Sequence, residues 1–205
     1  MTSLEILRTK LEELVKKWQE DERKQNSALQ FLWSKNNYIG FPRDYNKDPE
    51  GIIQRKKEKT DIFDLKKSFQ NTIKFVEYGK RDKNCHAYTC LGISAVSDLL
   101  PDKSRALENG EQLFLLLKRE GLLKESNEGK VVLWFKGNNL KHSGIKNKKI
   151  VVSKWGAGNI YSHKLLEVPL MYGNPQCFEL VGSESNLKSF KLKFYKILKY
   201  YEEAT

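Results

Sequence analysis

Hydrophobic positions along the chain repeat with a helical period near both ends and with a strand period between them. Residues 3–24 place an apolar residue every three or four positions, with Glu and Lys elsewhere, which predicts an amphipathic helix. Its apolar stripe consists of Leu4, Leu7, Leu11, Leu14, Val15 and Trp18. Residues 34–60 carry Gly, Pro and Asn without periodicity, so they predict a linker and a domain boundary near residue 60.

Two further segments have the length and pattern of ordinary helices. A second helix is predicted over roughly 61–77, with Thr60 and Asp61 as its cap, and it ends where the sequence reads GKRDKN. Another is predicted over about 104–120, beginning at Ser104.

A short helix is predicted between these two, and it contains two cysteines. Asn84 is a good N-cap, and Gly92 can end the helix after Leu91. Cys85 is therefore expected at the helix N-terminus, whereas Cys90 lies later in the helix and is expected to point into the core.

After residue 121 the period changes to that of strands. The segments 130–137, 140–146 and 148–156 are short and β-rich, and the residues between them suit tight turns, which is typical of an antiparallel meander. Two more strands are predicted at 163–170 and 175–182. Helices followed by an antiparallel sheet indicate an α+β fold.

The C-terminal segment returns to a helical period. Residues 186–203 carry an apolar stripe opposed by lysines, which predicts a helix packed back on the domain. The sequence therefore divides into a helical extension with its linker at 1–59, an α+β domain at 60–182 and a C-terminal helix at 183–205.

The chain is basic, with 37 Lys and Arg against 26 Asp and Glu, a net charge of +11. Such a charge favours anionic partners, including nucleic acid, although lysine-rich surfaces are also common without any such role. No acidic residue lies between Glu128 and Glu167. The candidate residues for binding an anionic partner in this stretch are Lys141, Lys146, Lys148 and Lys149.

The three cysteines do not indicate a disulfide framework or a metal site. Cys85, Cys90 and Cys177 are an odd number, and the Cys and His spacings do not match zinc ligands, so no metal or cofactor is predicted. The N-terminus lacks the apolar region of a signal peptide, and no apolar run is long enough to span a membrane. We expect a cytoplasmic protein, with a dedicated secretion route left open.

Cys85 has the sequence position of a nucleophile. A helix N-terminus stabilises a thiolate and also the oxyanion that forms when the thiolate attacks a carbonyl. A base is then required, and His86 is adjacent on the helix and diverges from the sulfur. His142 lies on a predicted strand, where alternation places it on one face with Leu140 and Gly144. The alternative is that Cys85 is an inert buried thiol and His142 a structural histidine.

Several short motifs between residues 83 and 182 occur in a known order. Asn84, Cys85 and Ala87 open the short helix; GKVVLWFKG precedes His142; then come VSKWG at 152–156, NIYSH at 159–163 and Tyr172-Gly173. This order resembles the papain-like cysteine peptidases of the NlpC type, closest to an uncharacterised bacterial branch. The chain departs from that pattern at Trp155, which follows Lys154, and at AVSDLLP after the cysteine helix.

The resemblance implies a papain-like α+β domain with helices packed on a small antiparallel sheet. It implies Cys85 as the nucleophile and His142 as the base, with Ser153 or His163, and less readily Lys154, orienting the imidazole. Asn84 would cap the helix or contribute to an oxyanion hole. Cys85 would form a thioester, as in peptidases, amidases, deamidases and acyltransferases, and the substrate would be a peptide or protein.

The second hypothesis is a non-catalytic basic module that binds nucleic acid or an acidic protein. Basic segments interleaved with Trp134, Phe135, Trp155 and Tyr161 favour it, because aromatic rings can stack on bases while lysines neutralise phosphates. Under either hypothesis, the one-sided N-terminal helix suggests a protein partner or self-association.

Overall fold

The protein folds as helices on both faces of one antiparallel sheet. The computed structural model describes residues 2–35, 49–79, 84–100, 106–155 and 158–203. Within these ranges every helix is too short or too polar to serve as a bilayer-spanning segment. The α+β class predicted from the sequence is confirmed.

The sheet has seven strands in the order β1-β6-β5-β4-β3-β7-β2, and every pair is antiparallel. Its strands are β1 (Lys74–Glu77), β2 (Leu123–Glu125), β3 (Val131–Lys136), β4 (Asn139–Asn147), β5 (Ile150–Lys154), β6 (Ile160–His163) and β7 (Asn174–Leu180). Strands β3 to β6 follow one another as a meander, and β7 returns to pair with β3. The predicted meander is therefore confirmed.

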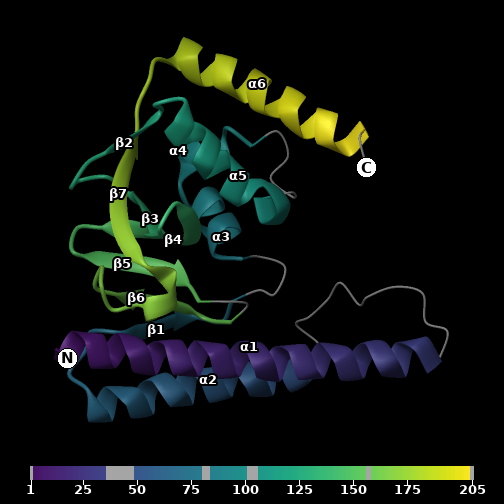
Figure 1. Cartoon of the computed structure of the whole chain (residues 1–205), viewed down its shortest axis with the longest axis vertical. Helices are drawn as coiled ribbons and strands as arrows, with labels where there is room; N and C mark the ends of the chain where they lie inside the picture. Colours follow the sequence, from purple (N-terminus) through teal and green to yellow (C-terminus); the bar gives the residue numbers. More distant parts are fainter. Residues whose placement is uncertain (1, 36–48, 80–83, 101–105, 156–157, 204–205) are drawn as a thin grey trace.

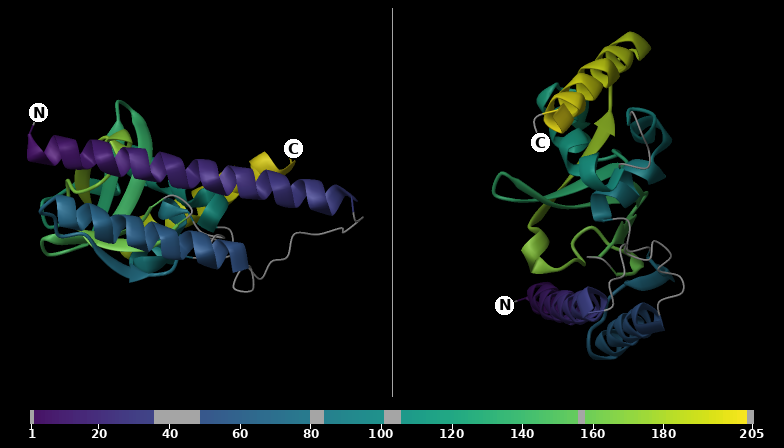
Figure 2. Two further views of the ribbon diagram at one scale, coloured as in Figure 1. Left: turned by 90° about the horizontal axis from the view of Figure 1, so that it is seen from below. Right: turned by 90° about the vertical axis from the view of Figure 1, so that its right-hand side faces the viewer.

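Two antiparallel helices, α1 (Ser3–Lys35) and α2 (Pro49–Ser68), lie side by side along one side of the molecule (Figures 1 and 2). The indole N–H of Trp18 donates to Asp61 at 2.8 Å and joins the two helices. The apolar stripe of α1 is buried against the sheet, with Leu7, Leu11 and Val15 at most 3% exposed. The face that was expected to attract a partner therefore packs within the chain.

The other face of the sheet carries the remaining helices. These are α3 (Cys85–Gly92), α4 (Ser94–Ser97), α5 (Ala106–Arg119) and α6 (Glu184–Glu203). A second core lies beneath them, to which α6 contributes Phe190, Phe194 and Leu198. Figure 1 shows α6 at the end of the molecule away from α1. The predicted C-terminal helix is confirmed.

Three sequence predictions about individual elements are wrong. The expected linker at 34–60 includes the first half of α2, so the expected boundary near 60 falls inside a helix; residues 36–48 lie outside the described ranges. The expected helix at 61–77 ends at Ser68 and is followed by β1. The strand expected at 163–170 does not form, because β6 (Ile160–His163) overlaps this range only at His163 and residues 164–169 are turns and irregular structure.

Helix α2 begins in a stretch that looked like loop because Pro suits the first turn of a helix, where its missing N–H would be unpaired anyway. Helix α5 begins at Ala106, close to the predicted start, whereas Ser104 lies outside the described residues.

Candidate functional site

Cys85 is the first residue of α3, as predicted. The side chain of Asn84 accepts a hydrogen bond from the backbone N–H of Ala87 at 2.8 Å, which is the expected N-cap. Cys85 is partly exposed, whereas Cys90 is buried, with its sulfur 3.7 Å from the carbonyl oxygen of Gly110. The structure thus distinguishes the two thiols in the way the helix position predicts.

Opposing influences act on the Cys85 thiol. Burial raises its pKa to about 11, while the backbone N–H of Ser143, the charge of Lys154 and the N–H groups of His86 and Cys85 itself act to lower it. The thiol is therefore protonated near neutral pH, and a reaction at Cys85 needs a base. The same N–H groups suit an oxyanion that forms beside the sulfur.

Ser143 attaches the first turn of α3 to the sheet. Its hydroxyl lies 3.0 Å from Nδ1 of His86, 3.0 Å from Oγ1 of Thr89 and 3.1 Å from the carbonyl oxygen of Cys85. Burial lowers the pKa of His86 to about 4. His86 is thus a neutral group that positions the helix, in agreement with the expectation that it does not face the sulfur.

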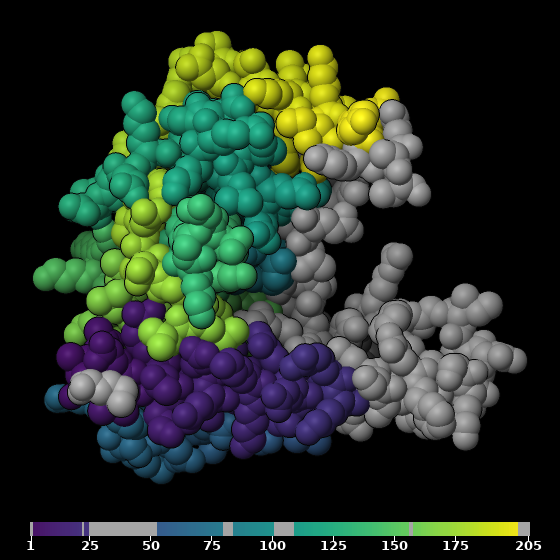
Figure 3. Space-filling view, in the orientation of Figure 1, coloured from purple at the N-terminus to yellow at the C-terminus, as the bar shows by residue number. Residues whose placement is uncertain are grey.

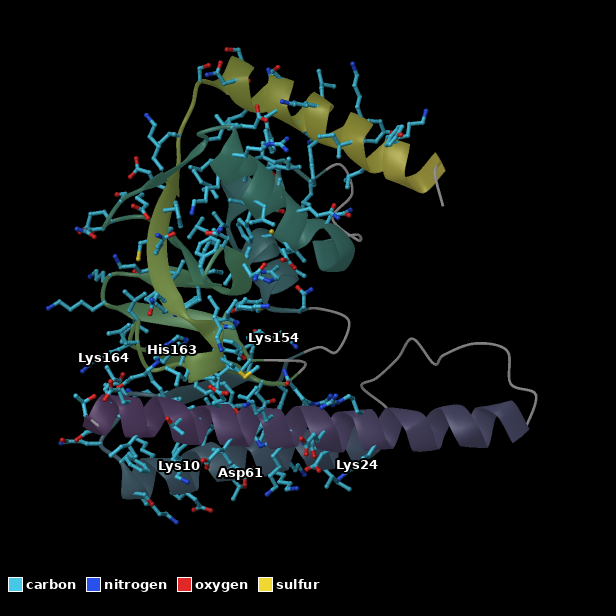
Figure 4. The ribbon with its side chains drawn as sticks, viewed as in Figure 1. Lys10, Lys24, Asp61, Lys154, His163 and Lys164 are labelled. Carbon is cyan, nitrogen blue, oxygen red and sulfur yellow. The ribbon has the colours of Figure 1, made fainter. Side chains whose placement is uncertain are left out.

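Lys154, at the end of β5, is 1% exposed and is within electrostatic range of Cys85. Its side chain passes Gly79, where an added Cβ would lie 2.8 Å from the Lys154 Cε and 1.9 Å from the carbonyl oxygen of Gly158. Only glycine at position 79 leaves this passage open. Figure 4 labels Lys154 above the α1–α2 pair, from which Lys10, Lys24 and Asp61 project.

His142 lies on the opposite face of the sheet from α3. Its ring stacks on Tyr172 with centroids 4.0 Å apart and planes at 11°, and lies 5.0 Å from the ring of Trp134. Trp134 and Tyr172 belong to the core beneath α1. His142 is 1% exposed, and neither ring nitrogen has a hydrogen-bond partner among the described residues.

His142 shares a face with Gly144, as predicted, but not with Leu140, because β4 contains a bulge. Trp134 pairs with His142 and the next residue, Phe135, pairs with Leu140, so Lys141 is an extra residue in β4. Leu140 consequently joins the core beneath α3, while His142 faces the core beneath α1. As a result, no described hydrogen bond joins His142 to the Cys85 sulfur.

Ser153 and His163 form a hydrogen-bonded chain of their own. The indole N–H of Trp155 donates to the Ser153 hydroxyl at 3.0 Å, and that hydroxyl lies 2.8 Å from Nε2 of His163. Since the Trp155 indole can only donate, Ser153 donates to Nε2, and His163 Nδ1–H donates to the carbonyl oxygen of Lys164 at 2.8 Å. Neither Ser153 nor His163 bonds to His142.

The buried histidines are neutral. Burial lowers the pKa of His163 to about 4, partly opposed by its bond to Lys164 and the charge of Glu167. Burial, together with the nearby His86 and His163, lowers the pKa of His142 well below its usual value. His142 is therefore a neutral imidazole near pH 7, and its surroundings disfavour the protonated form.

The four lysines proposed for an anionic partner do not form one cluster. Lys141 is exposed at the bulge, whereas Lys148 and Lys149 are exposed at the turn after β4. At about 3.3 Å per residue, Lys141 and Lys148 are roughly 20 Å apart. Lys146 lies between them and bonds to the carbonyl oxygen of Asn127.

A groove of about 710 Å³ lies at the other end of α3. It is lined by Gly92 to Ala95 and by the ends of β3, β4 and β7, and neither Cys85 nor His142 lines it. Among the residues that the structure describes, no group of three or more His, Cys, Asp or Glu side chains is placed to hold a metal ion.

Two residues of this region were not singled out as functional by sequence reasoning. Arg8 of α1 binds backbone carbonyls next to Tyr172, and Tyr172 covers His142. Arg8 could have been noticed in the sequence. It lies three positions before Leu11 and seven before Val15, which places a charged residue on the apolar face of the helix.

Comparison with models of protein families, with curated proteins and with solved structures found no match to the chain.

Proposed function

We propose that the chain is a cysteine hydrolase or acyltransferase with a papain-like domain, in which Cys85 is the nucleophile and His142 the base. The observation that carries the proposal is the environment of the Cys85 sulfur. It sits at a capped helix N-terminus, among three backbone N–H groups and within range of the buried Lys154. These groups favour negative charge on sulfur and on an adjacent oxyanion.

The reaction begins with transfer of the Cys85 thiol proton to neutral His142. Sulfur forms a bond to an acyl carbonyl carbon, and the carbon–nitrogen bond of the substrate breaks as His142 returns the proton to the leaving amine. Water, or another nucleophile in a transferase, then attacks the thioester and releases the thiol. The pair thus gives one proton to the leaving amine and regains one from the attacking water or other nucleophile, so the full cycle restores the thiol and the neutral imidazole.

The two side chains lie on opposite faces of β4 and share no hydrogen bond, so we place one water between them. General-base catalysis permits transfer through a single water. Both nitrogens of His142 are buried and lack partners among the described residues, so this water has to be an internal one that reaches a ring nitrogen. Ser153 and His163 are engaged with each other and take no part in this proton transfer.

Alkylation by iodoacetamide at pH 7.5, followed by peptide mapping, tests the proposal. We expect Cys85 to react faster than Cys177 and Cys90, and the His142→Ala variant to lose roughly tenfold or more of that rate, because general-base assistance contributes about 10²–10⁴-fold. His163→Ala serves as the matched control and should retain the Cys85 rate. Equal, slow labelling of all three thiols would refute the proposal.

The exposed lysines support a second candidate, a basic module that binds nucleic acid or an acidic protein. Lys148 and Lys149 project from the tight turn between β4 and β5. A gel shift with single-stranded DNA, weakened by salt and lost on reversal of both charges, would favour this function. Binding that is unchanged by the reversal would exclude these lysines as its basis.

A further inference from the structure

Arg8 of α1 holds a short turn on the edge of the His142 region. Its Nε donates to the carbonyl oxygen of Val168 at 3.3 Å, and its Nη2 donates to that of Gly173 at 2.7 Å. These carbonyls flank the 3₁₀ turn η3 (Leu170–Tyr172). Figure 3 shows α1, in purple, packed directly against the yellow-green part of the chain that includes this turn. Arg8 thus fixes η3 from both ends.

Gly173 attaches the same turn to the sheet. Its φ is +86°, and an added Cβ would lie 2.0 Å from the carbonyl oxygen of Phe135 in β3. Only glycine allows η3 to approach β3 this closely. The turn is therefore held by α1 on one side and by the sheet on the other.

The turn η3 places the ring of Tyr172 against the ring of His142. The Tyr172 side chain is 5% exposed, and its ring lies parallel to the imidazole at 4.0 Å between centroids. No described hydrogen bond sets the orientation of the imidazole, because both its nitrogens lack partners. The stack on Tyr172, together with the tilted contact with Trp134, is what fixes the plane of the ring.

We infer that Tyr172, held in place by Arg8 of α1, is the positioning residue for the His142 base. This inference rests on the proposed function, and it makes the N-terminal helix part of the reactive site. In a catalytic triad a hydrogen bond orients the imidazole. In this chain an aromatic stack and an arginine clamp take over that task, while both ring nitrogens, though buried, have no hydrogen-bond partner among the described residues.

Nitrogen-15 NMR of the histidine rings tests the positioning without depending on activity. In Tyr172→Leu we expect the His142 ring signals to shift and to titrate at higher pH than in the wild type, because water reaches the ring. Arg8→Met should cause the same change to a smaller extent. His163, bonded at both nitrogens, is the internal control and should not move. Unchanged His142 signals in both variants would overturn the inference.

The rate of Cys85 alkylation links the position of the ring to the proposed reaction. Tyr172→Leu should lower this rate roughly tenfold, since small displacements of a catalytic group cost up to about 10²-fold, while Tyr172→Phe keeps the stack and should stay within about twofold. If His142→Ala lowers the rate but Tyr172→Leu does not, the positioning role is refuted alone. If His142→Ala also has no effect, the proposed function fails and the inference with it.

Discussion

The two faces of the sheet differ in how fully their buried polar side chains are hydrogen-bonded. Beneath α3, the Ser143 hydroxyl lies within hydrogen-bonding distance of His86, Thr89 and the Cys85 carbonyl oxygen. Beneath α1, His163 is bonded at both nitrogens, while neighbouring His142 is bonded at neither. Buried polar groups normally have hydrogen-bond partners. The unpaired imidazole of His142, beside the fully bonded His163, therefore lowers the stability of the fold, which indicates that its role is not structural.

Acidification should lower the free energy of unfolding through buried histidines on both faces of the sheet. This is the largest effect that we expect. Burial lowers the pKa values of His86 and His163 to about 4 in the folded chain, against about 6.5 when unfolded. The unfolded chain therefore binds more protons between pH 6.5 and 4, so this stability is present above pH 6.5 and is lost as the pH falls.

His86 and His163 alone should make the free energy of unfolding fall by roughly 4 kcal/mol between pH 6.5 and 4.5, and His142, whose pKa is also lowered, adds to this fall. Urea unfolding at a series of pH values measures this. Replacing His163 with Phe should remove one of these contributions and reduce the slope. A free energy of unfolding that is constant over this range would show that these histidines are not buried as described.

A matched pair of substitutions separates the two histidines beneath α1. His163→Phe leaves the Ser153 O–H without its acceptor, removes one of the two donors to the Lys164 carbonyl oxygen, and should lower the free energy of unfolding by about 1–3 kcal/mol. His142→Phe removes two unpaired nitrogens and keeps an aromatic ring against Tyr172, so it should raise the free energy by about 1 kcal/mol.

Urea unfolding at pH 7.5, followed by tryptophan fluorescence, measures both variants. Equal losses of stability in the two would mean that His142 is as well bonded as His163, which would remove the contrast between them.

The smallest expected effect concerns the charge of Lys154 near the sulfur on the α3 face. In Lys154→Met the pKa of Cys85 should rise further, because the lysine charge lowers it. A rise of about half a pH unit would slow alkylation at pH 8 roughly threefold. Lys164→Met, which removes an exposed lysine from the end of β6, is the control and should leave the rate unchanged.

Strong local signals made much of the fold predictable. The cap at Asn84 located Cys85 at the start of α3, and tight turns revealed the β3–β4–β5 meander. Strands β1 and β2 were missed because four and three residues are too few to show a period. Helix α2 was misread because its first half lacks an apolar stripe and begins with proline, which also marks loops.

The candidate site was less predictable, because its arrangement depends on pairing between strands. Alternation placed His142 beside Leu140, and a bulge that only the β3 register reveals moved them to opposite faces. Likewise, Ser153 and His163 were expected to orient the His142 imidazole, but they bond to each other, to Trp155 and to a backbone carbonyl. Sequence spacing named the residues of this region without telling which would meet.

The bulge at Lys141 also bears on how the strand tolerates change in length. Because Phe135 already pairs with Leu140 and Trp134 with His142, loss of the codon for residue 141 would leave a regular hairpin with every other side chain on its present face. Loss of a codon from the paired part of β4 farther from the bulge would turn over the residues between that point and the bulge. Residue 141 is thus a place where the strand can shorten while each remaining side chain keeps its face of the sheet.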